Sequence, residues 1–201
     1  MITKDKKHYI GLIFLICIFI WSLVKPKSYL IWILEAAPLI IGIPVLILTY
    51  KKFKFSNLTY MLILIASCVM LIGGHYSYTE VPLFSWIQKI FNLSRNHYDR
   101  VGHFVQGATA ALIIREILWK FRIVKGKVWL IIISICMCLA VSAFYEIIEF
   151  AITFIVGGEA DAFLGMQGDI WDAQWDMICA LAGAIVFNFV FSALWRGEKE
   201  N

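Results

Sequence analysis

The sequence lacks the short motifs that identify many enzymes. It has no G-x-S-x-G nucleophile elbow, no phosphate-binding Walker loop, no H-E-x-x-H zinc helix and no G-x-G-x-x-G dinucleotide loop. It also has no basic groove and no nucleic-acid motif, so we expect no nucleic acid among its partners. Function must therefore be inferred from composition and from the spacing of polar residues.

The cysteines of this chain are not expected to form a disulfide framework. The five cysteines all lie inside apolar runs, and none falls in a segment predicted to face the outside of the cell. Cys136 and Cys138 are two positions apart, which is not the spacing of a metal knuckle. We therefore expect all five to act as small core hydrophobes, and a disulfide-stapled fold is excluded.

Long hydrophobic runs dominate the chain. Of its 201 residues, 61% are hydrophobic, whereas a soluble domain averages about 45–50%. A membrane-spanning helix needs about 20 predominantly apolar residues. The sequence therefore predicts an all-α, polytopic membrane helix bundle that forms a single domain over residues 1–201. The six predicted transmembrane helices are residues 8–24, 29–50, 57–77, 100–120, 128–156 and 171–195.

Two segments are assigned from their flanks and their length. The run from Tyr9 to Val24 mimics a signal peptide, but Lys25-Pro26-Lys27 follows it in place of a small-residue cleavage site. We interpret this run as a retained first span. Residues 82–92 are too short to span, and their apolar side chains repeat at helical spacing. They predict a short interfacial helix on the outer surface of the bilayer.

Positive charge is distributed unequally between the two sides of the predicted bundle. One side, made of both tails and residues 51–56 and 120–127, has 12 Lys and Arg residues, and the other side has 5. Arg115 lies inside the fourth span, where we expect it and Glu116 either to snorkel or to pair. Cytoplasmic loops carry the excess of positive charge. The N- and C-termini are therefore predicted to be cytoplasmic.

Nearly every ionisable residue inside the apolar runs falls near one face, the outer one. Each charge in hydrocarbon costs roughly 2.5–3.5 kcal/mol on insertion scales, so this clustering indicates one shared polar site. Residues three, four or seven positions apart share a helix face. This spacing groups Asp99, His103 and Gln106; Glu146 and Glu149; and Asp169, Asp172 and Asp176. Glu35 and His75 lie in the outer parts of the second and third spans.

The acidic residues at this depth need compensation, because close like charges disfavour one another's ionisation. Protons, nearby cations or a divalent metal can provide it. Carboxylates and a histidine on facing helices are the composition of a metal site in a bundle, and they also suit acid–base catalysis. The metal ligands are predicted to be His103, Glu149 and Asp176. The catalytic candidates are these three with Asp99, Glu146 and Asp172, and the supporting residues are Glu35, His75, Arg100, Gln106, Asp169 and Gln174.

Three segments carry a resemblance to a known family: residues 98–104 (YDRVGHF), 145–149 (YEIIE) and 164–177 (LGMQGDIWDAQWDM). They resemble the YjdF family of bacterial inner-membrane proteins, and the likeness covers most of the chain. A more distant likeness is to VanZ-like membrane proteins, whose pattern matches Asp99, Arg100 and His103, then Glu146 or Glu149, then Asp176 with Gly183. These resemblances imply a multi-pass protein of the cytoplasmic (inner) membrane with a shared polar site. They supply no reaction.

Three functions fit this pattern. The one we favour is a membrane enzyme at the extracytoplasmic face, which uses a divalent metal or acid–base catalysis on a lipid or lipid-linked envelope substrate. The second is a small proton- or cation-coupled transporter, because Glu35 near Pro38 fits an ion site in a broken helix. The third is a non-catalytic binding or assembly protein with an interhelical polar network. The lipid bilayer is a partner in each case, and the oligomeric state is left open.

Overall fold

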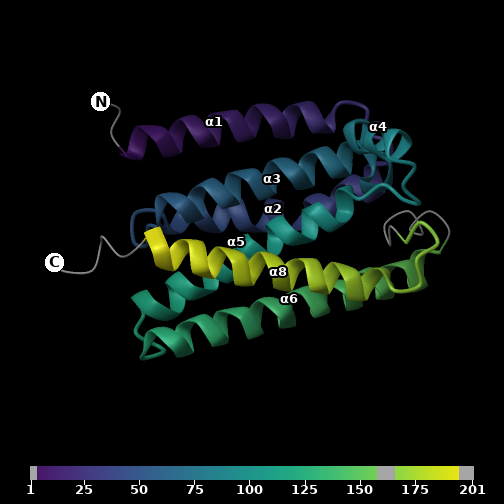
Figure 1. Cartoon of the computed structure of the whole chain (residues 1–201). Helices are drawn as coiled ribbons and strands as arrows, with labels where there is room; N and C mark the ends of the chain where they lie inside the picture. Colours follow the sequence, from purple (N-terminus) through teal and green to yellow (C-terminus); the bar gives the residue numbers. More distant parts are fainter. Residues whose placement is uncertain (1–3, 158–165, 195–201) are drawn as a thin grey trace. The chain divides into compact units, whose positions relative to one another are not determined.

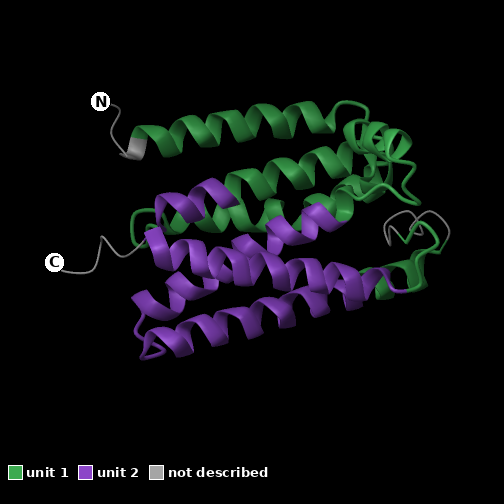
Figure 2. Cartoon of the chain, in the orientation of Figure 1, with its two compact units in different colours: residues 1–54, 63–99, 149–170 green, residues 55–62, 100–148, 171–201 purple. Residues whose placement is uncertain are grey.

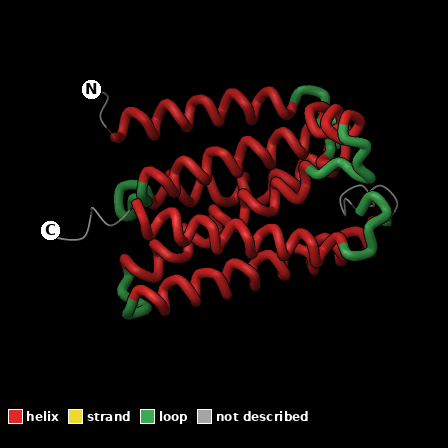
Figure 3. Tube along the Cα trace, in the orientation of Figure 1, coloured by secondary structure: helices red, strands yellow, loops and turns green. Residues whose placement is uncertain are grey.

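The computed structural model describes residues 4–157 and 166–194. Within these ranges the chain forms helices and loops and no strand (Figure 1 and Figure 3), which confirms the all-α fold. The helix ends lie within two residues of the predicted span ends, except at the start of α1. The elements are α1 (Lys4–Leu23), α2 (Tyr29–Thr49), α3 (Asn57–Tyr76), the 3-10 turn η1 (Tyr78–Glu80), α4 (Pro82–Ile90), α5 (Tyr98–Lys120), α6 (Lys127–Val156) and α8 (Asp172–Leu194).

Five helices are long and apolar enough to cross a membrane: α1, α2, α3, α6 and α8. The remaining predicted span, the fourth along the chain, is α5. With 23 residues it is about 34 Å long, which suffices for a hydrocarbon core of roughly 30 Å, but polar residues interrupt it. Only Val101, Trp119 and Lys120 of α5 are exposed. Because α5 faces protein over nearly its whole length, it carries polar groups that a lipid-facing helix cannot.

The chain divides into two compact units (Figure 2). Unit 1 comprises residues 1–54, 63–99 and 149–170, and unit 2 comprises residues 55–62, 100–148 and 171–201. The border between the units falls inside the first turn of α5. Tyr98 and Asp99 belong to unit 1, and the rest of the helix belongs to unit 2. The single domain expected over residues 1–201 stays a prediction.

The core of unit 1 lies between α1, α2 and α3. It is a cluster of Leu15, Trp32, Ala36, Leu39 and Leu71. The Trp32 indole N–H donates a hydrogen bond to the Ser22 hydroxyl at 3.1 Å. Because a buried indole needs such an acceptor, this bond fixes α2 against the end of α1.

The short helix predicted over residues 82–92 is present as α4. Leu83 and Trp86 on one side of it are exposed. On the other side, the ring centre of Phe84 lies 5.2 Å from that of Tyr98. α4 therefore covers the residue at which α5 begins and presents an apolar face outward, as an interfacial helix requires.

In unit 2 the backbones of α5 and α8 approach each other closely. A Cβ atom added to Gly107 would lie 2.1 Å from the Ala180 carbonyl oxygen, and one added to Gly183 would lie 2.0 Å from the Phe104 carbonyl oxygen. No larger residue fits at either position. Small residues allow membrane helices to pack at this distance, and the contact adjoins His103 on α5.

Candidate metal site

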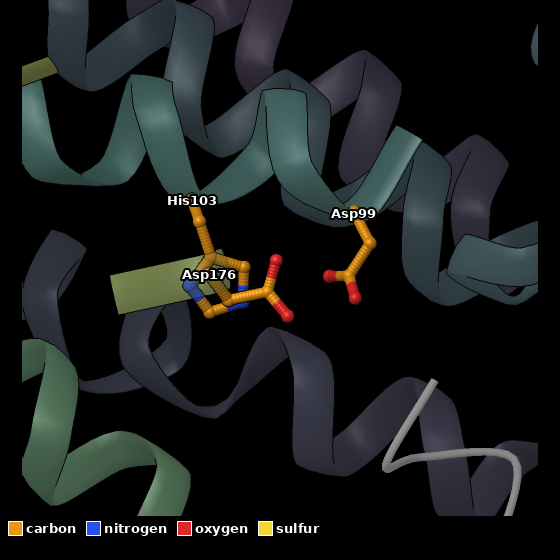
Figure 4. Close-up of side chains that lie close together, drawn as sticks. All are labelled: Asp99, His103 and Asp176. Carbon is orange, nitrogen blue, oxygen red and sulfur yellow. The ribbon is translucent and has the colours of Figure 1, made fainter. Parts of the chain in front are cut away.

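Among the described residues, one group of acidic and histidine side chains has the spacing of a metal site: Asp99, His103 and Asp176. Each offers one ligand atom, and these atoms all lie within 4.8 Å of one another. The residues are 8%, 5% and 2% exposed, respectively. Figure 4 shows Asp99 and His103 projecting from the same helix, with the Asp176 carboxylate beside the His103 ring.

Helical spacing positions the members of this group. Asp99 and His103 are four residues apart in the first turns of α5, so they share one face of that helix. Asp176 has the same relation to Asp172 at the start of α8, and both are buried. The contact of α8 with α5 at Gly183 then brings the two faces together.

A divalent metal fits these side chains after a small contraction. Bonds from zinc to histidine nitrogen or carboxylate oxygen are about 2.0–2.2 Å, so two ligands of one ion lie at most about 4.4 Å apart. Ligand atoms at the 4.8 Å limit of the group therefore have to approach each other by about 0.4 Å, which rotation of the carboxylates can provide. One imidazole and two carboxylates leave coordination positions open for water or substrate.

Glu146 of α6 lies beside His103. Its Oε1 is 3.7 Å from His103 Nδ1, and the ring of the preceding residue, Tyr145, is centred 6.5 Å from the imidazole. A carboxylate next to one ring nitrogen orients a histidine and raises its basicity towards a metal at the other nitrogen. The predicted catalytic candidate Glu146 is thus placed to act through His103.

Arg95 is a buried cation next to this group. Its Nη2 lies 3.8 Å from Asp99 Oδ2, and its Nη1 lies 3.6 Å from Asp169 Oδ2. Both distances exceed the usual length of a charge-assisted hydrogen bond, so these are loose ion pairs. Arg95 compensates part of the acidic charge, and the predicted supporting residue Asp169 shares this cation with Asp99.

Asn96 and Gln167 form a contact that is not among the interactions predicted from the sequence. The Asn96 backbone N–H donates to Gln167 Oε1 at 2.9 Å, and Gln167 Nε2 donates to the Asn96 carbonyl at 2.9 Å. The Asn96 side chain in turn accepts from the Tyr98 N–H at 3.0 Å, at the start of α5. This pairing ties the segment before α8 to the turn that begins α5. Its only sequence signal is the place of Gln167 in the motif at residues 164–177.

Nine of the predicted site residues lie outside the metal-spaced group, among them Glu35, Glu149, Gln106 and Gln174. Glu35 and Glu149 are buried and belong to unit 1, Gln106 is partly buried and Gln174 is exposed. The third member of the group is Asp99, whereas the ligand set predicted from the sequence has Glu149 as its third member. α5 therefore supplies two of the three side chains.

Two further predicted supporting residues have aromatic neighbours. His75 Nδ1 is 3.1 Å from the Ser22 carbonyl oxygen, and its ring is centred 4.5 Å from that of Trp21. His75 therefore packs against the end of α1. The Arg100 guanidinium lies over the Trp175 ring at 5.4 Å from its centre, a cation–π contact between α5 and α8.

A second buried polar cluster lies in unit 2, towards the other end of α5. Arg115 donates to the Asn188 carbonyl at 2.8 Å and to its Oδ1 at 3.1 Å. Glu116 accepts from the Ser56 N–H at 2.9 Å and from the Thr59 hydroxyl. Both charged residues are buried. Of the two expected outcomes, pairing is therefore observed and snorkelling is not.

Comparison with known proteins identifies the family. The model of a family described as "Predicted membrane protein (DUF2238)" matches residues 7–197. The chain belongs to this family. It is also 40% identical, over 168 residues, to inner membrane protein YjdF of Escherichia coli (strain K12), with 84% of this chain and 80% of that protein covered. No solved structure gives a significant match.

These matches, together with the five apolar helices, establish an integral membrane protein of the DUF2238 family. They confirm the resemblance to YjdF, whereas the more distant VanZ-like resemblance stays a prediction. The site residues come from the geometry alone.

Proposed function

We propose that this protein is a metal-dependent enzyme of the bacterial inner membrane that acts on a lipid or lipid-linked envelope substrate. Asp99, His103 and Asp176 bind the divalent metal, and Glu146 orients His103. A divalent metal held by these residues would supply Lewis-acid chemistry, either on an ester or phosphoryl oxygen of the substrate or on a water molecule. Asp172 adds negative charge one turn before Asp176.

The observation that carries this proposal is the burial of two carboxylates and an imidazole with ligand atoms within 4.8 Å of one another. Two ionised carboxylates at this spacing repel each other, and burial removes the water that screens them. A divalent cation relieves both costs. Arg95 contributes one positive charge to the same region, and a divalent cation would add two more.

Two observations support a site on the extracytoplasmic side of the inner membrane. The E. coli relative is named an inner membrane protein, and the excess of Lys and Arg on one side favours cytoplasmic termini. With that orientation, α5 and α8 both begin on the extracytoplasmic side. Lipid-linked envelope substrates reach a site there from the outer leaflet.

Metal content is the direct test. Detergent-purified protein is incubated with zinc, manganese or magnesium, freed of excess ion and examined by elemental analysis. We expect about one tightly held ion per chain, and its loss in His103→Gln and in Asp176→Asn. Circular dichroism and size-exclusion profiles equal to wild type are required of both variants. A well-folded wild type that holds no ion under any condition contradicts the proposal.

The variant Glu149→Gln distinguishes between two candidate ligand sets, which share His103 and Asp176 and differ in whether Asp99 or Glu149 is the third ligand. Retention of the metal supports the set with Asp99, and loss of the metal with retained folding supports the set His103, Glu149 and Asp176. The matching variant Asp99→Asn is expected to show the opposite result. Metal-loaded wild type is then screened for hydrolysis or transfer on lipid-linked substrates.

A proton- or cation-coupled transporter is the second candidate, and Glu35 is the observation that favours it. This carboxylate is buried in α2, which contains Pro38 and Pro44, and prolines free backbone groups that can line an ion site. Flux in proteoliposomes that Glu35→Gln abolishes, without any bound metal, would place transport first. Absence of both flux and metal, with variants that change only protein abundance, would place an assembly role first.

A further inference from the structure

The loop between α5 and α6 is a cationic segment that the proposed enzyme does not use. Its cations are Lys120, Arg122, Lys125 and Lys127, and the sequence has no Asp or Glu between residues 117 and 145. All four are exposed. Lys120 lies 3.6 Å from Glu116, whereas no ion pair of the other three is found in the described part of the chain.

The backbone holds one of these cations in an unfavourable conformation. Arg122 has φ 54°, in the left-handed region that favours glycine. Its N–H donates to the Trp119 carbonyl at 3.0 Å, and the Ile123 N–H donates to the Leu118 carbonyl at 2.9 Å. This is the hydrogen-bond pattern of a Schellman helix end, at which glycine is the usual residue. An arginine at this position costs stability, which indicates a use for its side chain beyond ending the helix.

Exposed apolar side chains flank the cations. Trp119 and Phe121 precede them, and Val128 and Trp129 follow them at the start of α6. Tryptophan is enriched where membrane helices meet the headgroup layer. α6 itself is long and apolar enough to cross a membrane, so its first turn lies near the bilayer surface. The cations therefore sit at the level of lipid phosphates.

We propose that the loop of residues 120–127 binds the phosphate group of an anionic phospholipid through Arg122, Lys125 and Lys127. Cations next to the membrane attract anionic headgroups, and a guanidinium pairs with two phosphate oxygens. The flanking aromatic side chains favour a lipid over a soluble phosphate, because they contact the apolar part of the same molecule. This inference is independent of the proposed enzyme.

Lipid selectivity tests it. Delipidated full-length protein in detergent is offered equimolar phosphatidylglycerol and phosphatidylcholine, and the retained lipids are counted by native mass spectrometry. We expect wild type to prefer phosphatidylglycerol. In the double variant Lys125→Gln/Lys127→Gln, each cation that is removed should lower that preference about fivefold. The control Lys25→Gln/Lys89→Gln removes two lysines that are also exposed and is expected to leave the preference unchanged.

The variant Arg122→Gly separates lipid binding from folding. Glycine relieves the left-handed backbone, so the melting temperature should rise while retention of phosphatidylglycerol falls. Equal retention of both lipids by wild type overturns the proposal, and so does full retention of phosphatidylglycerol by the double loop variant. Displacement of the lipid by millimolar glycerol 3-phosphate identifies a soluble phosphate as the ligand and overturns it as well.

Discussion

Gly183 of α8 lies against the carbonyl oxygen of Phe104 in α5, so close that a Cβ atom on Gly183 would be 2.0 Å from that oxygen. Phe104 directly follows His103, and Gly183 lies seven residues after Asp176 on the same helix. This close contact between the two helices therefore adjoins His103 on α5 and lies about two turns from Asp176 along α8. We therefore expect a change in the spacing of the two helices at Gly183 to alter the separation of His103 and Asp176.

Replacement of Gly183 by alanine should push α8 away from α5. We expect Gly183→Ala to destabilise the protein by about 1–3 kcal/mol, the usual cost of overpacking, and to weaken metal binding at the proposed site. Thermal unfolding in detergent and metal titration measure the two effects. Gly42→Ala is the matched control, because a Cβ there has nothing within 4 Å and alanine favours a helix. Wild-type stability of Gly183→Ala would show that the helices can separate at little cost.

The helices could be predicted from the sequence because the bilayer fixes their length and composition. The spacing of Asp99 and His103 likewise places them on one face of a helix without any knowledge of the fold. What spacing cannot tell is which helix faces meet. That depends on the backbone contact at Gly183, between residues far apart in sequence. For this reason the sequence groups Glu149 with His103 and Asp176, whereas the structure groups Asp99 with them.

The same limit applies to Arg115 and Glu116. Their place near a span end is compatible with snorkelling, and only the folded chain reveals their partners. Asn188 lies 73 positions from Arg115, and Thr59 lies 57 positions from Glu116. Because Asn188 and Thr59 are uncharged residues in apolar runs, no charge pattern in the sequence points to them. The ion pair of Glu116 with Lys120, four residues further on, is the one contact that helical spacing indicates.

Ser192 is one acceptor for the buried Arg115, and Asn188 provides two more, its carbonyl and its Oδ1. This Oδ1 also accepts from the Ser134 hydroxyl at 3.2 Å. Asn188→Ala removes the Oδ1 acceptor, whereas the backbone carbonyl and the Ser192 hydroxyl remain, and we expect a loss of about 1–3 kcal/mol in unfolding free energy. Asn188→Asp keeps an acceptor and adds a counter-charge, so it should be tolerated better. Unfolding in detergent and denaturant compares them, and equal stability of the two variants would contradict this role.

Gln167 clamps the backbone of the turn that begins α5. Gln167→Ala removes two hydrogen bonds to Asn96, each worth about 0.5–1.5 kcal/mol, and should loosen the turn before Asp99. We expect faster hydrogen exchange at residues 95–98 and a small drop in melting temperature. Gln174→Ala, in an exposed position on α8, is the matched control. Unchanged exchange in Gln167→Ala would mean that other contacts of Asn96 hold the turn.

Glu146 should affect the proposed metal through His103. Its Oε1 is 3.7 Å from His103 Nδ1, longer than a hydrogen bond, and the pair should tighten when a metal draws electrons from the ring. Loss of such a carboxylate typically weakens metal affinity about 10–100-fold, so we expect that range for Glu146→Gln, with the stoichiometry unchanged. Calorimetric titration of the folded variants measures the affinity.

Two comparisons make this test specific to the contact with His103. Glu80→Gln removes an exposed carboxylate and should leave the affinity at the wild-type value, which controls for a change in net charge. Glu146→Asp keeps the charge but withdraws it from the imidazole by one methylene group, so its affinity should fall between those of wild type and Glu146→Gln. If Glu146→Gln binds metal as tightly as wild type, the imidazole is oriented by other groups. If it binds no metal at all while folded, Glu146 is itself a ligand and joins Asp99, His103 and Asp176.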